Sequence, residues 1–213
     1  MSRDEFVYRS LMPATSEEVF AWHKRPGAFD RLTPPWANIE VVERTGGIED
    51  GARVVLVVHN GPLAIRWTLE HKNYAEGRQF SDFQVDGPFT TWEQVHKVEP
   101  DGPNQSYLED KVEYELPAGV AGELAAGFVI QHELERLFKY RHLTLAKDLE
   151  VTKQRVEPMK ILVSGSTGLI GSQLLPFLTT QGHSVTRLVR QKSTTPKAGD
   201  PAQGKVYWDP ARG

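Results

Sequence analysis

A glycine-rich turn near the carboxy terminus is the part of this sequence whose residue types and spacing most directly indicate chemistry. An apolar run from Met159 leads into seven residues with a glycine at every third position: Gly165, Ser166, Thr167, Gly168, Leu169, Ile170 and Gly171. Gly165 permits a tight turn, Gly168 lets the backbone approach a pyrophosphate, and Gly171 allows close packing of a helix on the strand. The helix that follows, to about Gln181, would present free N–H groups to the phosphates. With a second strand at Ser184–Val189, this pattern predicts the βαβ unit of a dinucleotide-binding site.

The end of that second strand indicates which dinucleotide the turn would bind. In an NAD site, an acidic residue at this position holds the ribose 2′-hydroxyl. Here the strand carries Arg187 and ends in Arg190. A guanidinium suits a 2′-phosphate, because it donates paired charge-assisted hydrogen bonds. The sequence therefore favours NADP over NAD; the alternative is that both arginines are ordinary surface cations.

The dinucleotide-binding pattern stops before such a fold is complete. A doubly wound sheet needs around six strands, and the last one recognisable here is the short apolar piece Val206–Trp208. No Tyr-x-x-x-Lys pair, the usual acid and base of a short-chain reductase, follows the glycines. We therefore expect a truncated segment over residues 159–213 that leaves this chain inactive as an enzyme and binds NADP weakly or not at all.

The truncated segment also bears on association. A parallel strand at Lys160–Ser164 with one neighbour missing would expose an edge and the apolar residues beside it. A second molecule could supply the missing neighbour, which predicts a homodimer through the carboxy-terminal segment. The alternative is that the segment stays mobile and contributes little to stability.

The histidines and carboxylates of the first 150 residues show no spacing that predicts a metal or a catalytic site. His59, His71 and His96 fall on separate predicted strands, and His132 and His142 on a predicted helix, without a His-x-x-x-His pair. His96, near Gln94 and Trp92, could be a polar contact at the mouth of a cavity, but we interpret it as exposed or satisfied by ordinary hydrogen bonds. The acidic residues expected on solvated strand faces are Glu93, Glu109, Asp110, Glu113 and Glu115. We therefore predict no metal site, and the sequence identifies no catalytic residue.

Strands must position most of these side chains, because residues 1 to 118 alternate apolar and polar in short runs broken by Gly, Pro, Asn and Asp. The predicted strands are Phe6–Leu11, Asn38–Arg44, Ala52–His59, Ala64–Tyr74, Arg78–Val85, Phe89–Val98 and Gln105–Leu116. One early helix is capped by Thr15 or Ser16 and ends near Pro26-Gly27. Apolar residues from Leu124 to Leu149 recur at helical spacing, which predicts a helix over about Gly122–Glu150, roughly 40 Å long.

These patterns divide the chain into three parts. Residues 1–150 form a curved antiparallel sheet that needs the long helix to cover it, residues 151–158 are a polar linker closed by Pro158, and residues 159–213 are the nucleotide-binding segment. The predicted fold class is therefore α+β, followed by an incomplete α/β unit of the Rossmann type.

Composition excludes several classes of function. The 25 basic residues are interspersed with 28 acidic ones for a net charge of −3, so there is no footprint for nucleic acid or an anionic membrane. No apolar run approaches the ~20 residues that span a bilayer. The chain has no cysteine, which excludes disulfides and thiolate metal sites and suits a reducing compartment. We expect a cytoplasmic protein whose partner is a small molecule.

Two segments resemble known families. Residues 161–172, Ile-Leu-Val-Ser-Gly-Ser-Thr-Gly-Leu-Ile-Gly-Ser, together with Val-Thr-Arg-Leu-Val-Arg and Val-Tyr-Trp-Asp-Pro further on, resemble the start of epimerase-like atypical short-chain dehydrogenase/reductases of the nucleoside-diphosphate-sugar epimerase family. The run from Ala14 to Trp22, the run from Pro26 to Trp36 and the run from Asp110 to Pro117 resemble a START-like, polyketide-cyclase-like helix-grip domain. Some members of the epimerase-like family carry the two modules in this order.

The resemblance implies a helix-grip cavity between sheet and helix that binds an apolar or aromatic molecule. Five aromatic residues are candidates to line it: Trp67, Phe80, Trp92, Tyr107 and Phe128. The alternative is that they fill a solid core. For function, the resemblance implies part of an NADP-dependent epimerase-like or reductase-like oxidoreductase. Two alternatives are a stand-alone module for a lipid or aromatic ligand, and a cyclase-like or hydrolase-like activity in the cavity.

Overall fold

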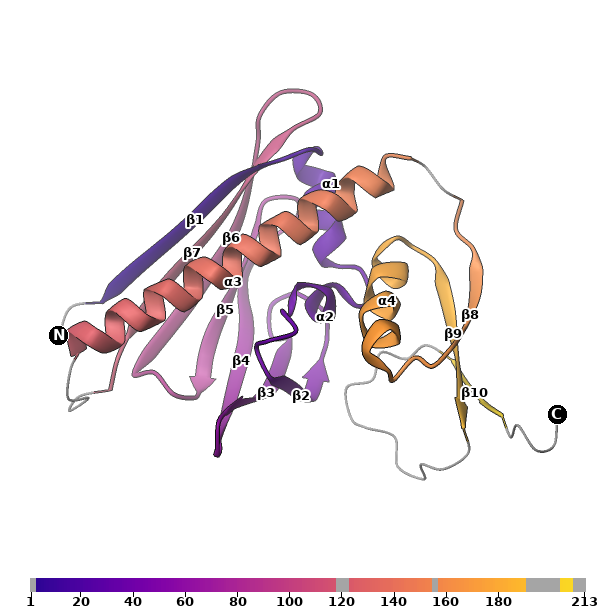
Figure 1. Ribbon diagram of the computed structural model, residues 1–213. Coiled ribbons are helices and arrows are strands. Elements are labelled where there is room, and N and C mark those ends of the chain that lie inside the picture. The colour runs from indigo at the N-terminus through magenta and orange to yellow at the C-terminus, as the bar shows by residue number, and fades with distance from the viewer. Residues whose placement is uncertain (1–2, 118–122, 155–156, 191–203, 209–213) are drawn as a thin grey trace.

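One large sheet is formed within residues 3–117. The computed structural model describes residues 3–117, 123–154, 157–190 and 204–208. The strands of this sheet, all antiparallel to their neighbours, lie in the order β1-β7-β6-β5-β4-β3-β2. Their bounds are β1 Asp4–Met12, β2 Ile39–Thr45, β3 Arg53–Asn60, β4 Leu63–Ala75, β5 Gln79–Asp86, β6 Thr91–Pro100 and β7 Ser106–Glu115. Figure 1 shows this sheet curving behind the long helix α3, Glu123–Thr152.

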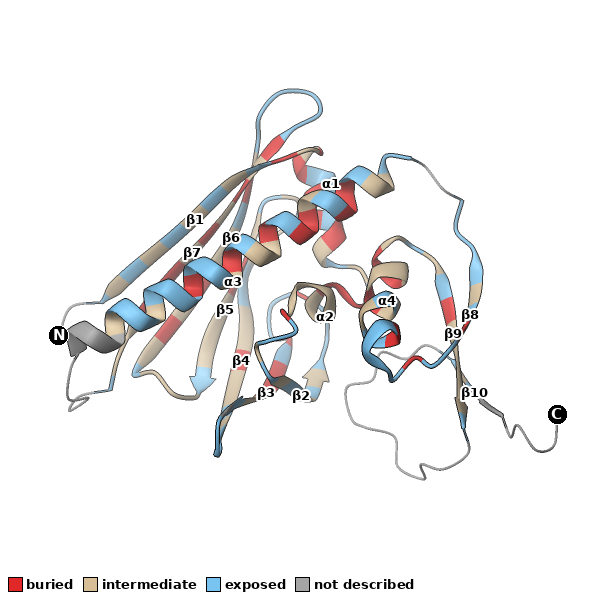
Figure 2. Cartoon of the chain, in the orientation of Figure 1, coloured by how far each residue is buried: buried red, intermediate tan, exposed pale blue. Residues whose placement is uncertain are grey.

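The alternation of the sequence and the helical stripe complement each other as expected. Along β7, every second side chain from Ser106 to Tyr114 is buried, because successive side chains of a strand point to opposite faces. On α3 the buried apolar positions follow steps of four and seven residues: Leu134, Phe138, Leu145 and Leu149. Figure 2 shows buried positions recurring along α3 where it crosses the strands. The helix-grip architecture is confirmed.

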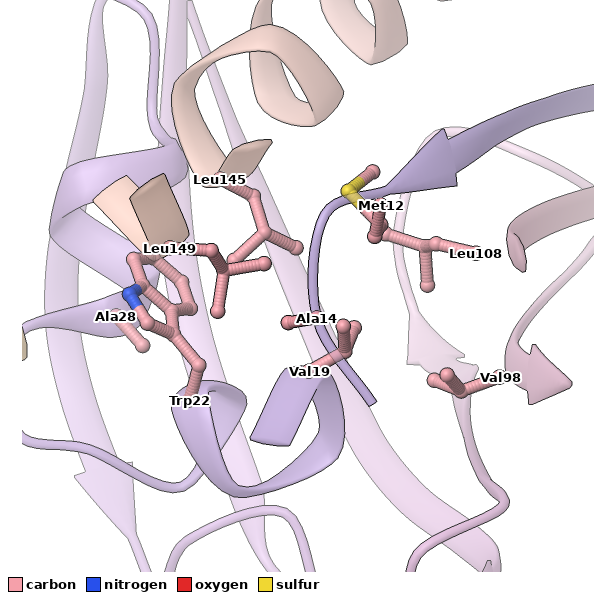
Figure 3. Close-up of a cluster of buried hydrophobic side chains, with 9 residues drawn as sticks. All are labelled: Met12, Ala14, Val19, Trp22, Ala28, Val98, Leu108, Leu145 and Leu149. Carbon is pink, nitrogen blue, oxygen red and sulfur yellow. The ribbon is translucent and has the colours of Figure 1, made fainter. Parts of the chain in front are cut away.

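Two short helices close one end of the sheet. In α1, Ser16–His23, Thr15 and Glu18 form a capping box, in which each side chain bonds the other's backbone N–H. The sequence did not predict α2, Ala28–Leu32, which follows Gly27 in a left-handed conformation. Here α1, the last turns of α3 and three strands share a compact apolar core (Figure 3). Its members are Met12, Ala14, Val19, Trp22, Ala28, Val98, Leu108, Leu145 and Leu149.

A small parallel sheet follows α3, in the order β10-β9-β8. Its elements are β8 Lys160–Ser164, α4 Leu169–Thr180, β9 Ser184–Arg190 and β10 Lys205–Trp208. The expected βαβ unit is therefore present. Within the described residues, β8 pairs with β9 alone, and Leu162 on it is 61% exposed. Association through this edge remains a prediction.

The small unit docks on the α1–α2 turn through α4 (Figure 1). Arg25 Nη1 donates to the Thr180 carbonyl at 2.5 Å. A Cβ atom at Gly27 would lie 2.5 Å from Thr179 Oγ1, so the backbone approaches α4 closely there. At the end of α3, Asp148 accepts two hydrogen bonds from Arg31, at 2.8 and 2.9 Å. Because α3 continues to Thr152, the first two residues of the expected linker 151–158 are helical.

Candidate functional site

A cavity of about 950 Å³ lies between α3, the α1–α2 segment and strands β2 to β6. Ligand sites for small molecules in proteins have volumes of this order. The face of α3 that borders the cavity carries Ile130, Leu134, Leu137 and Arg141, at helical steps of three and four residues. The sheet therefore does not close against the helix as a solid core along its whole length.

One end of the cavity is aromatic. Trp67 on β4 meets Trp92 on β6 edge to face, with ring centroids 5.0 Å apart. Phe89 packs against both indoles, at 5.6 Å from Trp67 and 4.8 Å from Trp92. The indole Nε1 of Trp67 is buried and has no hydrogen-bond partner within the described part of the chain. This end offers broad apolar contact and one unsatisfied donor.

The opposite end of the cavity is polar, and a carboxylate there lies between two imidazoles. His71 on β4 contacts Asp82 Oδ1 through Nε2 at 2.9 Å, and its Nδ1 lies 3.4 Å from the Ala52 carbonyl. His96 on β6 contacts Asp82 Oδ2 through Nε2 at 3.0 Å. Each nitrogen that faces a carboxylate or a carbonyl must carry a proton to make its hydrogen bond. The geometry therefore favours the imidazolium form of both rings.

Further polar contacts link His96 to residues that do not line the cavity. His96 Nδ1 lies 2.5 Å from Asp110 Oδ1, and Gln94 donates to that oxygen at 3.1 Å. Asp110 Oδ2 lies 2.6 Å from His142 Nε2, and His142 Nδ1 lies 2.6 Å from Ser10 Oγ. We call the six residues that run across the sheet the histidine–aspartate chain: His71, Asp82, His96, Asp110, His142 and Ser10.

Strand register explains how the histidine–aspartate chain crosses the sheet. His71 pairs with Asp82 across β4 and β5, and His96 pairs with Asp110 across β6 and β7. Directly opposed residues of an antiparallel pair point to the same face, with their Cβ atoms about 5 Å apart. On the neighbouring strands β5 and β6, Asp82 pairs with Gln94, two residues before His96. A polar row therefore forms on the face that α3 covers.

Within the histidine–aspartate chain, the ion pairs of Asp82, His96 and His71 outweigh burial and keep these side chains charged. Burial alone would raise the pKa of Asp82, but hydrogen bonds from His71 and His96 outweigh it and hold that pKa well below its usual range. Burial alone would lower the pKa of His96, yet Asp110 and Asp82 together raise it to about 9. The pKa of His71 is also raised, because Asp82 outweighs burial there. Charged pairs are therefore maintained inside the protein.

His23 at the end of α1 has the opposite charge preference, although it lines the same end of the cavity. Its Nδ1 lies 2.8 Å from the Val19 carbonyl and donates to it. Burial, reinforced by the positive charge of His96, lowers the pKa of His23 to about 4. The ring centroids of the two histidines are 6.2 Å apart. At neutral pH, a neutral imidazole with an acceptor nitrogen at Nε2 therefore lies beside a cationic one.

The glycine-rich turn forms a separate site at the amino end of α4. Gly165 has a φ of +68°, and Gly168 is the residue that caps the helix. A Cβ atom at Gly171 would lie 2.2 Å from the Gly165 carbonyl oxygen and 2.7 Å from Ser166 Cα. Any side chain at Gly171 would therefore push the helix off the turn.

The surroundings of this turn fit a phosphate. Thr167, Leu169 and Ile170 are exposed, whereas Ser166 is buried, and the helix begins without a side-chain cap on its N–H groups. Arg187 on β9 donates from Nε to Ser166 Oγ at 3.2 Å, and Arg190 is exposed at the end of the same strand. Arg187 thus contacts the glycine-rich turn directly, and a role for either arginine in binding a nucleotide stays a prediction.

Comparison with family models identifies the larger part of the chain. Residues 12–138 match the model described as polyketide cyclase/dehydrase and lipid transport. The chain belongs to this family. Residues 161–207 match the model of the NAD dependent epimerase/dehydratase family. A search of curated proteins found no match.

Several solved structures share the fold of this chain. A nucleoside-diphosphate sugar epimerase from Corynebacterium glutamicum is 24% identical with a TM-score of 0.70, and the alignment covers 96% of this chain but 45% of that one. An aromatase/cyclase from Streptomyces sp. R1128 is 14% identical, with a TM-score of 0.56 over 70% of this chain and 94% of its own. Norcoclaurine synthase from Thalictrum flavum is 12% identical, with a TM-score of 0.53 over 68% and 88%.

Three of the five aromatic residues predicted to line the cavity of this polyketide cyclase-like domain do so: Trp67, Phe80 and Trp92. The expectation was wrong for Tyr107 and Phe128. Tyr107 alternates with the buried residues of β7 and therefore points to the outer face, where the Arg9 guanidinium covers its ring at 4.4 Å. Phe128 is 76% exposed, because it lies off the buried stripe of α3.

The sequence did not predict the carboxylates at the polar end of the cavity. Asp110 was expected on a solvated strand face, but it is 3% exposed, since it shares the buried face of β7 with Leu108 and Val112. His96 lines the cavity together with Gln94, and its hydrogen-bond partners are the carboxylates of Asp82 and Asp110. One signal was available: Asp110 has the same parity along its strand as the buried apolar residues. Within the described residues, no group of three side chains suits a metal ion, and no helix is both long and apolar enough to cross a bilayer.

Proposed function

We propose that the helix-grip domain binds an apolar or aromatic small molecule in the cavity between α3 and the sheet. The observation that carries this proposal is the cavity itself, which is about 950 Å³ in volume and has two indoles at one end. A solid core would place those rings against α3 and leave no such space. Norcoclaurine synthase from Thalictrum flavum, which shares this fold, was crystallised with dopamine and hydroxybenzaldehyde. Both of these ligands are aromatic and small.

A substitution that fills the cavity should weaken binding strongly without unfolding the domain. Ile130 on α3 lines the cavity and is half-buried, so Ile130→Trp adds an indole to its wall. We expect the affinity for the neutral fluorescent probe N-phenyl-1-naphthylamine to fall by about tenfold or more. Lys139→Trp is the matched control, because it places the same indole on an exposed position of the same helix. Equal probe affinities in the two variants would contradict the proposal.

A second function concerns the nucleotide-binding segment. We propose that residues 159–208 hold the pyrophosphate of NADP and belong to an epimerase-like oxidoreductase. The close approach of Gly171 to Gly165 supports this, because it gives the helix the position that a phosphate site needs. The Corynebacterium glutamicum epimerase, whose chain is covered to 45%, contains further residues of its own. A nicotinamide pocket would have to come from additional strands of that kind.

Arg190 provides the test of the choice between NADP and NAD. In a protein with such a completed nucleotide domain, Arg190→Asp should replace attraction for the 2′-phosphate by repulsion and lower the NADP/NAD affinity ratio by about tenfold or more. Calorimetry with both dinucleotides measures the ratio. In the chain of 213 residues we expect weak NADP binding or none. An unchanged ratio would show that Arg190 does not contact the 2′-phosphate.

A further inference from the structure

We propose that the ligand of the cavity is an amphipathic organic acid, whose anionic group binds Arg141 and Arg44 while its apolar body lies against Trp67 and Trp92. This inference rests on the proposed function of the helix-grip domain and specifies the chemical class of its ligand. Three features of the cavity support it: the gradient of its lining, the balance of its charges, and the guanidinium groups of Arg44 and Arg141, which are held neither by a carboxylate nor by α4 within the described residues.

The lining changes from apolar to polar in the same direction on three elements. On β4, Trp67 is followed four residues later by His71, and on β6, Trp92 is followed four residues later by His96. These two strands run in the same direction, because both are antiparallel to β5 between them. On α3, Ile130 lies at the apolar end and Arg141 at the polar end, about 16 Å further along the axis. A ligand that fills the cavity must therefore be amphipathic.

The charges that line the cavity are unbalanced. Five basic side chains line it: Lys24, Arg25, Arg44, Arg53 and Arg141. The carboxylates of the lining are Asp82 and Glu133. Asp82 already holds His71 and His96, so it leaves no charge to neutralise an arginine. A neutral apolar ligand would bring no negative charge to those basic groups of the lining that lack a carboxylate partner.

Three of the five basic groups are engaged elsewhere. Lys24 pairs with Glu76 and Arg53 pairs with Glu70, both outside the lining. Arg25 donates to the Thr180 carbonyl of α4. The remaining two are Arg44 and Arg141, and neither forms an ion pair within the described residues. They are the groups available to an anion.

Both available guanidinium groups line the cavity and contact α2. Arg141 donates from Nε to the Leu32 carbonyl at 3.3 Å, which fixes the side chain and leaves its terminal nitrogens for a ligand. Arg44 lies over the Phe29 ring at 4.9 Å, and its Nη2 is buried without a hydrogen-bond partner in the described part of the chain. Burial lowers the pKa of Arg141 despite the attraction of Asp110 and Asp82. A bound anion would relieve that unfavourable desolvation.

A matched pair of ligands tests the proposal. The anion 2-naphthoate and the neutral 2-naphthamide have nearly the same shape, and each can displace N-phenyl-1-naphthylamine from the chain at neutral pH. We expect the wild-type chain to bind naphthoate about tenfold or more tightly than the amide, since charge-assisted hydrogen bonds to a buried guanidinium are strong. Arg141→Met should remove this preference while the affinity for the amide changes by less than about twofold. Arg141→Lys should retain part of it.

Control variants keep the result interpretable. Arg66→Met removes an exposed arginine of β4 that does not line the cavity, and it should leave the preference unchanged. If Arg141→Met fails to fold, Arg44→Met carries the same test. Displacement of the bound probe with equal affinity by both ligands contradicts this inference but not the proposed function, as does a preference that survives loss of both arginines. A chain that does not bind the probe contradicts both.

Discussion

Asp110→Asn should lower the free energy of unfolding by about 3–5 kcal/mol, because it removes the negative charge that links two imidazoles inside the protein. The carboxylate is 3% exposed and lies between His96, His142 and Gln94. Asparagine has nearly the same shape, so the packing of β7 against α3 changes little. The imidazolium of His96 would retain Asp82 as its single carboxylate. Urea denaturation of both chains at neutral pH measures the difference.

Glu109→Gln is the matched control for this prediction. Glu109 is the neighbouring residue on β7 and points to the outer face, where its carboxylate lies 3.5 Å from Arg9 Nη1. Solvated ion pairs of this kind contribute about 0–1 kcal/mol. We expect the control to stay within that range. Similar losses in the two variants would show that the histidine–aspartate chain is no more important for stability than a surface pair.

His96 and His23 should titrate at pH values far apart although their rings are neighbours. Because Asp110 and Asp82 outweigh burial, the pKa of His96 is raised to about 9, whereas burial and the charge of His96 lower the pKa of His23 to about 4. NMR titration of the imidazole C–H signals measures both values in one sample. A pKa near 6.5 for both rings, the value of unperturbed histidine, would contradict the charge states derived from the contacts.

The same pKa values predict how stability depends on pH. The folded pKa of His96 lies above its unfolded value, so its stabilising contribution is complete below about pH 6.5 and is lost as the pH rises through about 9; this loss amounts to roughly 3 kcal/mol. For His23 the folded pKa is the lower one. Its contribution is therefore complete above about pH 6.5 and is lost as the pH falls toward 4. Stability should be greatest near pH 6.5, as measured by urea denaturation across this range.

Local sequence patterns were sufficient for the elements of the fold. Each predicted strand of the large sheet lies within two residues of an observed one at either end, as β7 shows, which was expected at Gln105–Leu116 and observed at Ser106–Glu115. Alternation of apolar and polar residues indicates which side chains of a strand are buried, because successive side chains point to opposite faces of the sheet. The short helix α2 was missed, since its five residues contain too little periodicity to recognise.

The glycine-rich turn could be predicted because its determinants are contiguous. Gly165, Gly168 and Gly171 meet across one turn between β8 and α4, and the structure places Gly171 against Gly165 for the reason that the spacing suggested. The lining of the cavity could be predicted from the sequence only in part. Trp67 and Trp92 share the parity of buried neighbours on their strands, but parity cannot tell whether a ring fills a core or borders an empty space. Phe128 was misplaced for another reason, because it lies on α3 away from the buried stripe of that helix.

The sequence by itself determined the alternating strands, the long helix and the glycine-rich turn, because each depends on neighbours within a few positions. The tertiary structure alone decided the polar end of the cavity. His96 meets Asp82 across 14 residues, His142 meets Asp110 across 32, and Ser10 meets His142 across 132. No spacing rule connects such positions, since strand register and the placement of α3 bring them together. Their charges are retained in the interior because each is paired there, and that pairing exists only in the folded chain.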